Sequence, residues 1–297
     1  MKINSATLDA LRVGFKTSFQ GGLGQHQSQH QRVATTVPSS AREEKYGWLG
    51  KLPNMREWVG DRVIQNLLEH DYAIKNRPFE LSIGVDRDDI EDDTLGVYAP
   101  LFTEMGLSTA AHPDLLIFSL LKAGFATTCF DGQYFFDTDH PVVQADGTVA
   151  SVANTDGGGG TPWFLLSTRR ALKPLIFQER KKPEFVSRDD AKDEAVWRKK
   201  EFQYGVDSRC NAGFGFWQMA WGSKQTLNAT YYKAARAGIM GMKGDHGRPL
   251  GLVPDLLVVP PSLESDGVKL LNSEYAAGGE TNEWKGTAEL LVVPWLA

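Results

Sequence analysis

Residues 202 to 216 hold the longest alternation of apolar and polar side chains in the sequence. Every second position from Phe202 to Phe216 is apolar or small, and the positions between them are mostly polar or glycine. Successive side chains of a strand point to opposite faces of a sheet, so the pattern predicts a half-buried strand. At about 3.3 Å per residue, it would be an unusually long strand or a bent hairpin arm. Cys210 lies on the apolar face, which favours a small core residue over a reactive thiol.

Other segments predict strands and helices without regular strand–helix–strand alternation. Phe79–Val85 alternates as a half-buried strand, and Trp163–Leu166 predicts a buried one. A helical pattern starts after Thr94, and Pro113 is expected to begin a second helix that ends at Gly124. The charged residues 179–200 predict a solvated loop. A helix is expected around Leu227–Ala237, followed by a C-terminal strand–helix–strand unit at residues 254–261, 262–271 and 289–294.

The N-terminal segment predicts an amphipathic helix from Ser5 to Phe19, with Ser5 as N-cap and Gly21-Gly22 as its end. Residues 21–31 are rich in Gly, Gln and His and have almost nothing apolar to bury. Such a segment is expected to be an extended arm, held in place only by something outside the chain.

Composition limits the classes of function. Of the 297 residues, 41% are hydrophobic and the net charge is -5, which argues against a dedicated nucleic-acid binder that needs clustered Lys and Arg. No apolar run approaches the length of about 20 residues that a membrane helix needs, and Met1–Ser5 has no signal-peptide core. Two cysteines are too few for a disulfide framework or a zinc cluster, so a reducing, intracellular setting is expected.

Each chemical motif is weak. Gly157–Gly160 lacks the Lys that a phosphate-binding loop requires, and the acidic run Asp86–Asp93 lacks the alternating ligands and central Gly of a calcium loop. The acidic run is better explained as a helix-capping, solvated segment. Asp137, Asp139 and His140 could ligate a metal, but a turn at Asp131-Gly132 leading into a strand explains the region better. We therefore expect no catalytic residue, no cofactor and no metal.

A charged strip with interspersed aromatic residues covers residues 42 to 77. Exposed Trp and Arg side chains are favoured anchors of protein interfaces, although tryptophans of an ordinary surface lobe could equally be tucked into the core. The candidate contacts to a partner subunit are Trp48, Arg56, Trp58 and Arg62.

The order of several short motifs resembles the major head subunit family of Mu-like bacteriophages. The likeness spans nearly the whole chain, and it is carried by the order and spacing of the motifs more than by any one of them. They are Trp48-Leu49-Gly50, Arg56-Glu57-Trp58, Asn76–Glu80, Asp89–Asp93, His112-Pro113-Asp114, Asp131–Phe136 through His140, Tyr204–Arg209, Arg248–Gly251 and Leu257–Pro261.

The resemblance implies an α+β fold of the Hong Kong 97 capsid type. It places an N-terminal arm at residues 1–39 and an extended E-loop at 40–85. A peripheral domain with a long spine helix, broken or kinked near Pro113, would comprise 86–130 and 200–222. An axial domain with excursions would comprise 131–199 and 223–297. The covalent cross-link of one member of the fold is not carried over, because no Lys–Asn pair here can be matched to it.

The resemblance also implies a function: a structural protein, not an enzyme, that self-assembles through pentamers and hexamers into an icosahedral phage head. The expected partners are a scaffold, a maturation protease, a decoration protein and packaged double-stranded DNA bound without sequence specificity, with no membrane. The subunit would reside in the virion capsid after assembly in the host bacterial cytoplasm. Two alternatives stay open: a metal- or nucleotide-dependent soluble enzyme, and a non-viral shell of the same fold that encloses cargo.

Overall fold

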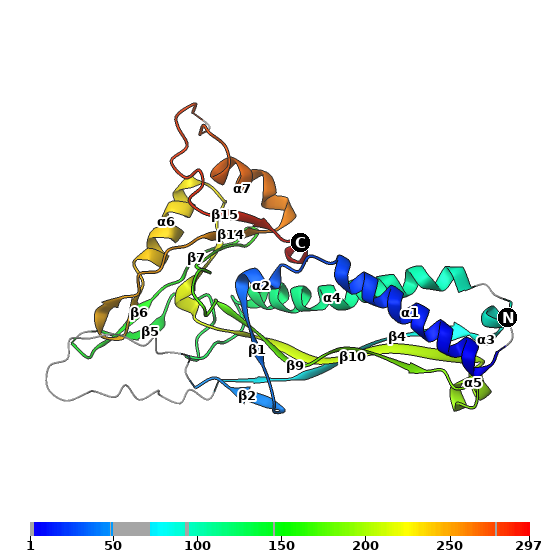
Figure 1. Ribbon diagram of the computed structural model, residues 1–297. Helices are drawn as coiled ribbons and strands as arrows, with labels where there is room; N and C mark the ends of the chain where they lie inside the picture. The colour runs from blue at the N-terminus through cyan, green and yellow to red at the C-terminus, as the bar shows by residue number, and fades with distance from the viewer. Residues whose placement is uncertain (1–2, 48, 50–71, 93–94, 145, 277) are drawn as a thin grey trace.

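The computed structural model describes the chain except for residues 1–2, 48, 50–71, 93–94, 145 and 277. An elongated lobe of long strands and two long helices extends to one side, and a second lobe with shorter strands rises from its end (Figure 1). The helices are α1 (Ser5–Gln25), α2 (His30–Val33), α3 (Arg87–Glu91), α4 (Tyr98–Ala123), α5 (Glu194–Lys199), α6 (Ala229–Met240) and α7 (Glu264–Leu271). Within these described parts, no helix is both long and apolar enough to cross a membrane.

The strands of the described residues form two main sheets and three two-stranded pairs. The long sheet has the order β1-β9-β10-β4, with β1 (Ala34–Pro38), β4 (Arg77–Asp86), β9 (Leu175–Arg188) and β10 (Glu201–Phe214). The second sheet has the order β15-β14-β8-β11-β7, with β7 (Thr155–Gly158), β8 (Trp163–Leu166), β11 (Ala220–Lys224), β14 (Leu256–Val259) and β15 (Glu289–Val292). The pairs are β2 (Glu43–Lys45) with β3 (Ala73–Lys75), β5 (His140–Val143) with β6 (Val149–Val152), and β12 (Lys243–Gly244) with β13 (Arg248–Pro249).

The long alternating strand is confirmed as β10, at the centre of the long sheet. It pairs antiparallel with β4 on one side and with β9 on the other, so that Val206 lies opposite both Leu81 and Phe185. The predicted apolar face is the buried one, with Phe202 and Tyr204 almost completely covered. The predicted strand at residues 79–85 is also confirmed, as β4.

The prediction of a solvated loop over residues 179–200 is wrong. Most of this segment forms the second half of β9 and helix α5, which connect directly to β10. In the second half of β9, exposed and half-buried positions alternate, so its charged side chains occupy the solvent face of a paired strand. Pairing with β10 over nearly its full length therefore overrides the weak strand propensity of the local sequence.

The predicted end of the first helix at Gly21-Gly22 is wrong, because α1 continues to Gln25. Its N-cap is Asn4, whose side chain accepts a hydrogen bond from the Thr7 amide at 2.9 Å. The glycine is needed for helix packing: a Cβ on Gly22 would lie 2.0 Å from the Thr103 carbonyl oxygen of α4. A Cβ on Gly106 would likewise lie 2.2 Å from the Phe19 carbonyl oxygen, so the two helices touch backbone to backbone.

The predicted helix boundary at Pro113 is also wrong. Helix α4 runs without interruption from Tyr98 to Ala123, with Pro113 inside it. Proline removes one backbone hydrogen bond and crowds the preceding turn, which costs about 3 kcal/mol in an unsupported helix. Here both halves of α4 are packed, Phe102 and Met105 in one core and Ile117 and Leu121 in the other.

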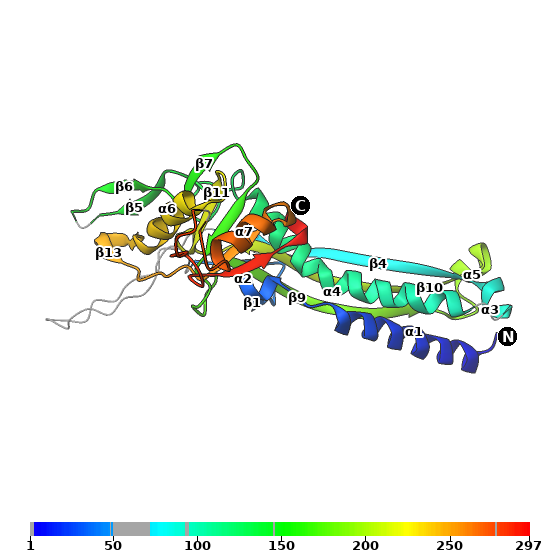
Figure 2. The same cartoon turned by 90° about the horizontal axis from the view of Figure 1, so that it is seen from above.

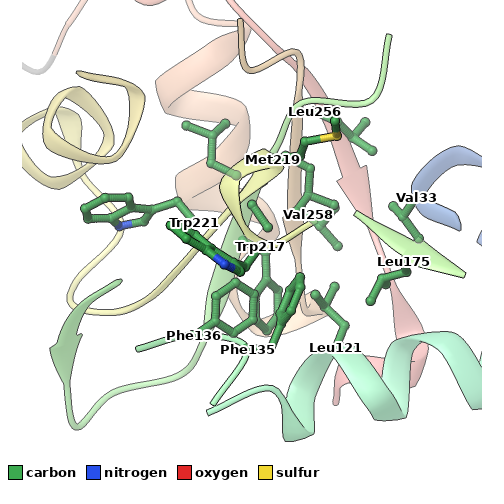
Figure 3. Packing of buried hydrophobic residues seen from close by; sticks show 14 of the residues in the cluster. Val33, Leu121, Phe135, Phe136, Leu175, Trp217, Met219, Trp221, Leu256 and Val258 are labelled. Carbon is green, nitrogen blue, oxygen red and sulfur yellow. The ribbon is translucent and has the colours of Figure 1, made fainter. Parts of the chain in front are cut away.

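The C-terminal strand–helix–strand unit is confirmed as β14, α7 and β15, with the two strands parallel and adjacent. Every residue of β8 and of β14 is buried, as expected for strands covered on both faces. The large core around this sheet reaches Leu121 of α4, Leu175 of β9, Trp217 just before β11 and Trp221 within β11 (Figure 3). Helix α6 covers the same lobe and confirms the helix expected around Leu227–Ala237.

Candidate functional site

The four predicted anchors, Trp48, Arg56, Trp58 and Arg62, lie outside the described residues. The base of the segment that carries them is described. Strands β2 and β3 pair with Glu43 opposite Lys75, and the Tyr46 amide donates to the Tyr72 carbonyl at 2.9 Å. The two described ends of this segment therefore lie side by side.

A buried polar network fixes this base to the long sheet. The Tyr46 hydroxyl donates to Gln178 Oε1 of β9 at 2.8 Å, and Gln178 Nε2 donates to the Ile74 carbonyl at 2.9 Å and to Asn76 Oδ1 at 2.8 Å. Asn76 in turn donates to Ser39 Oγ at 2.8 Å. Because Gln178 and Asn76 are buried and their bonds are satisfied, the hairpin base is held in one orientation.

A second polar junction joins the end of α1 to the middle of α4. The Asp114 carboxylate is fully buried and accepts hydrogen bonds from His26 Nε2 at 2.7 Å, His30 Nδ1 at 3.0 Å and Ser28 Oγ at 2.9 Å. The amides of Gln29 and His30 donate to it as well, at 3.1 and 2.7 Å. Burial alone would raise the pKa of Asp114, but the hydrogen bonds from His30, Gln29 and His26 outweigh it and hold this pKa well below its usual range.

This junction corrects the expectation of an extended arm at residues 21–31 that only an external partner could order. The Gln- and His-rich tract forms the last turn of α1, a short linker and α2. Its polar side chains are used to satisfy one buried carboxylate from the same chain, a partner that lies 84 or more residues away in the sequence. Local composition could not reveal that partner.

Asp137, Asp139 and His140, the proposed metal ligands, do not form one ligand set within the described part of the chain. His140 Nδ1 bonds to Asp131 Oδ2 at 2.7 Å, and Asp137 accepts the amides of Tyr134 and Thr138. Cys129 joins the same cluster, with Sγ 3.1 Å from Asp131 Oδ1. The sequence reasoning thus missed Cys129 and Asp131 as neighbours of His140.

The glycine run at residues 157–160 has a structural explanation. Gly157 and Gly158 have positive φ angles of 68° and 102°, and Gly158 pairs with Lys224 of β11. A Cβ on Gly158 would lie 2.5 Å from the Lys224 backbone, so glycine permits the close approach of β7 to β11. The next element is the strand β8 and not a helix, so the run has no helix N-terminus to bind a phosphate.

Among the described residues, Trp197 is the most exposed of the large hydrophobic side chains. Trp197 of α5 is 87% exposed, at the far end of the elongated lobe (Figures 1 and 2). Val97 and Leu101, at the start of α4, are exposed near the same end. Tryptophan is among the residues enriched at the anchor positions of protein interfaces.

Comparison with known proteins gives consistent matches along the whole chain. The sequence model of the Mu-like prophage major head subunit gpT matches residues 8–296. The major capsid protein of Escherichia phage Mu is 46% identical, with 100% of both chains covered. The Mu-like prophage FluMu major head subunit of Haemophilus influenzae is 45% identical, with 90% of this chain and 89% of that protein covered.

Solved structures give the same result for the fold. The subunit in the procapsid of bacteriophage JBD30 superposes with a TM-score of 0.87 at 45% identity, covering 99% of this chain and 100% of that one. The bacteriophage JBD30 capsid gives a TM-score of 0.78 at 33% identity, covering 100% of both chains. The predicted α+β capsid fold of the Hong Kong 97 type is thereby confirmed. The chain belongs to the family of major head subunits of Mu-like prophages, the structural proteins that form the phage capsid.

Proposed function

We propose that this subunit tiles pentamers and hexamers into a closed icosahedral head that encloses double-stranded DNA without reading its sequence. The observation that carries the proposal is the likeness over 99% of the chain to the subunit of the JBD30 procapsid. A net charge of -5 suits a container wall that must not retain the phosphates of its cargo. We propose no catalytic role for any residue.

The proposed division of the chain has an arm at residues 1–39 and an E-loop at 40–85. Residues 86–130 and 200–222 form the peripheral domain, and 131–199 with 223–297 form the axial domain and its excursions. Within the stretch 131–199, strand β9 pairs along its length with β10. We therefore assign β9 to the peripheral domain, and we assign β11 with the rest of the second sheet to the axial domain.

Contacts between subunits are proposed at two places. Trp48, Arg56, Trp58 and Arg62 lie in the sequence between β2 and β3, and would bind a neighbouring subunit. Trp197 at the opposite end of the elongated lobe would contact another. Because each copy would grip several neighbours, modest individual contacts add up to a stable shell through avidity.

Further partners are proposed for assembly in the host bacterial cytoplasm: a scaffold and a maturation protease. A decoration protein is also proposed, because one of the similar JBD30 structures is a capsid decorated with minor capsid protein trimers.

Negative-stain electron microscopy and sedimentation of the full-length chain, expressed alone and with scaffold and protease, test this function. We expect closed shells or rings of five and six subunits. A chain that stays monomeric at high concentration in both conditions would contradict the proposal. The variant His140→Ala adds a check on the enzyme alternative, which predicts loss of a turnover that the shell subunit does not have.

A further inference from the structure

A thiol, a carboxylate and an imidazole converge in the loop between α4 and β5. The Cys129 Sγ atom lies 3.1 Å from Asp131 Oδ1, and His140 Nδ1 lies 2.7 Å from Asp131 Oδ2. All three donor atoms lie within 4.8 Å of one another. Cys129 and His140 are buried and the Asp131 side chain is 8% exposed, so the cluster is shielded from bulk solvent but still reached by it at Asp131.

These three donors form a ligand set that zinc prefers. Zinc binds thiolate sulfur at about 2.3 Å, imidazole nitrogen at about 2.0–2.1 Å and carboxylate oxygen at about 2.0–2.2 Å. Donors around a tetrahedral zinc ion therefore lie roughly 3.3–3.6 Å apart. The distance from Cys129 Sγ to Asp131 Oδ1, 3.1 Å, and the distance from His140 Nδ1 to Asp131 Oδ2, 2.7 Å, are shorter than this. Rotations of the three side chains would open the space for the ion. A thiolate among the ligands disfavours magnesium and calcium, which take oxygen ligands.

The backbone around the cluster is already ordered. The Cys129 amide donates to the Gln133 carbonyl at 2.8 Å, and Gly132, at φ 88°, closes a tight turn between them. The Gln133 amide donates to Asp131 Oδ1 at 3.1 Å and orients the carboxylate. The His140 ring is stacked on Trp217, with centroids 3.9 Å apart and planes 9° apart. Such surrounding contacts fix first-shell ligands and favour metal binding, because little ordering remains to be done.

We propose that Cys129, Asp131 and His140 bind one zinc ion, with the fourth position taken by a water molecule, and that the ion fastens the α4–β5 loop to the core. The proposal goes beyond the proposed function of a head subunit, which was argued without a metal. The expectation that two cysteines are too few for a zinc site overlooked that Asp131 and His140 can supply the remaining ligands.

The hydrogen bonds of the metal-free cluster determine which protons zinc binding must displace. Without metal, the Cys129 thiol and the His140 imidazole both donate to the Asp131 carboxylate. On zinc binding, the thiol loses its proton to solvent, and the imidazole proton moves from Nδ1 to Nε2, which bonds to no other described residue. One proton is released per ion bound. Burial and the nearby Asp131 carboxylate raise the pKa of the Cys129 thiol, so the thiolate forms here only when a cation compensates for its charge.

The competing explanation is a purely hydrogen-bonded turn in which Asp131 accepts from the thiol and the imidazole. Both explanations account for the burial of the cluster, and they differ in metal content. The test therefore measures metal on the purified full-length chain, whether assembled or not. It can fail without affecting the proposed function, and the proposed function can fail without affecting it.

The experiment is a titration of the chelator-treated chain with Co²⁺, followed by competition with Zn²⁺ and by elemental analysis. We expect one ion per chain, an intense visible spectrum typical of tetrahedral cobalt, and a thiolate-to-cobalt charge-transfer band. The variant Cys129→Ser should lose the charge-transfer band and at least tenfold in affinity. Cys210→Ser is the matched control, since Cys210 is also buried but lies on β10 away from these ligands, and it should keep both.

Less than about a tenth of an ion per chain in the wild-type protein would overturn the proposal. So would a spectrum that Cys129→Ser leaves unchanged, because the ion would then sit elsewhere. Should Cys129→Ser fail to fold, Asp131→Asn takes its place, and it should keep the charge-transfer band while it weakens binding. An Asp131→Asn protein that binds cobalt as tightly as the wild type would equally contradict the assignment.

Discussion

The two lobes of the molecule are held together in different ways. The second lobe is built on a sheet whose strands β8 and β14 are buried at every position, inside a large continuous core. In the elongated lobe, a smaller aromatic core lies between α1, α4 and the long sheet, where Phe15 stacks on Phe102 at 4.2 Å. Helix α1 is held by this small core, by glycine contacts with α4 and by the Asp114 junction. We therefore expect α1 to be released before the second lobe unfolds.

The largest effect is expected in the second lobe. Phe164 lies in the central strand β8, fully buried against Phe136 at 5.4 Å. Replacing Phe164 with Ala should cost about 3–5 kcal/mol of the free energy of unfolding, through lost burial and the cavity left behind. Thermal denaturation should show one cooperative transition at a lower temperature.

Phe15→Ala is the matched change in the other lobe, and hydrogen exchange should show α1 opening while β8 and β14 stay protected. Exchange that rises equally in both lobes would contradict the comparison.

Asp114→Asn should weaken the junction at the end of α1. An amide cannot accept as many hydrogen bonds as the carboxylate, and loss of one charge-assisted bond costs about 1.5–3 kcal/mol. Because folding lowers the pKa of Asp114, its contribution is fully present above the ordinary carboxyl pKa of about 4 and is lost as the pH falls below it.

Hydrogen exchange of residues 5–33, measured against pH in both proteins, checks this prediction. The difference between wild type and Asp114→Asn should be constant from about pH 5 to 7 and shrink toward zero in stronger acid. A difference that grows as the pH falls would show that Asp114 is not the ionised acceptor of the junction.

Replacing two neighbouring glycines of α1 should change the free energy of unfolding by smaller amounts, and the two changes should have opposite signs. Gly22→Ala would force a methyl group onto the Thr103 carbonyl and should destabilise the α1–α4 contact by about 1–3 kcal/mol. A Cβ at Gly21 meets nothing within 4 Å, so Gly21→Ala should stabilise the helix by about 0.5–1 kcal/mol. Chemical denaturation of the two variants checks the signs, and equal signs would show that α1 does not pack on α4 through Gly22.

Trp197→Ala should have the smallest effect on folding, since its side chain is 87% exposed. Its free energy of unfolding, measured by thermal denaturation, is expected to stay within about 0.5 kcal/mol of the wild-type value. Assembly should suffer instead, with fewer complete shells by electron microscopy. The nearby surface variant Arg198→Ala, which removes only the exposed pair with Glu194, serves as the control. If Trp197→Ala forms complete shells in normal yield, Trp197 is not part of the contact surface.

Strong periodicity made the centres of both sheets predictable. The alternation from Phe202 and the unbroken apolar runs at Trp163–Leu166 and Leu256–Val259 identified β10, β8 and β14, because each pattern matches how that strand is buried. The extents of helices α1 and α4 were less predictable, because their sequences carry local signals that the fold overrides. Gly22 and Pro113 normally end helices, and here close helix contact and packing on two cores override those local preferences.

The polar clusters were hidden from sequence reasoning because their members come together only through the fold. Asp114 receives its bonds from residues 26–30, and nothing in the local pattern links the two segments. Cys129, Asp131 and His140 lie close in sequence, but the sequence pattern drew attention to Asp137 and Asp139 as ligands of a metal with His140. Asp137 accepts a backbone amide, and Asp139 interacts with Asp137. The predicted anchors Trp48, Arg56, Trp58 and Arg62 stay predictions, since they lie outside the described residues.

We expect this chain to build a closed shell in which each copy binds its neighbours through the segment between β2 and β3. A cryo-electron microscopy map of particles formed by the full-length chain tests it most directly. We expect a closed icosahedral shell in which the segment between Tyr46 and Tyr72 lies across an adjacent subunit and buries Trp58 there. A shell in which this segment folds back onto its own subunit, or a chain that forms no shell with its scaffold, would contradict it.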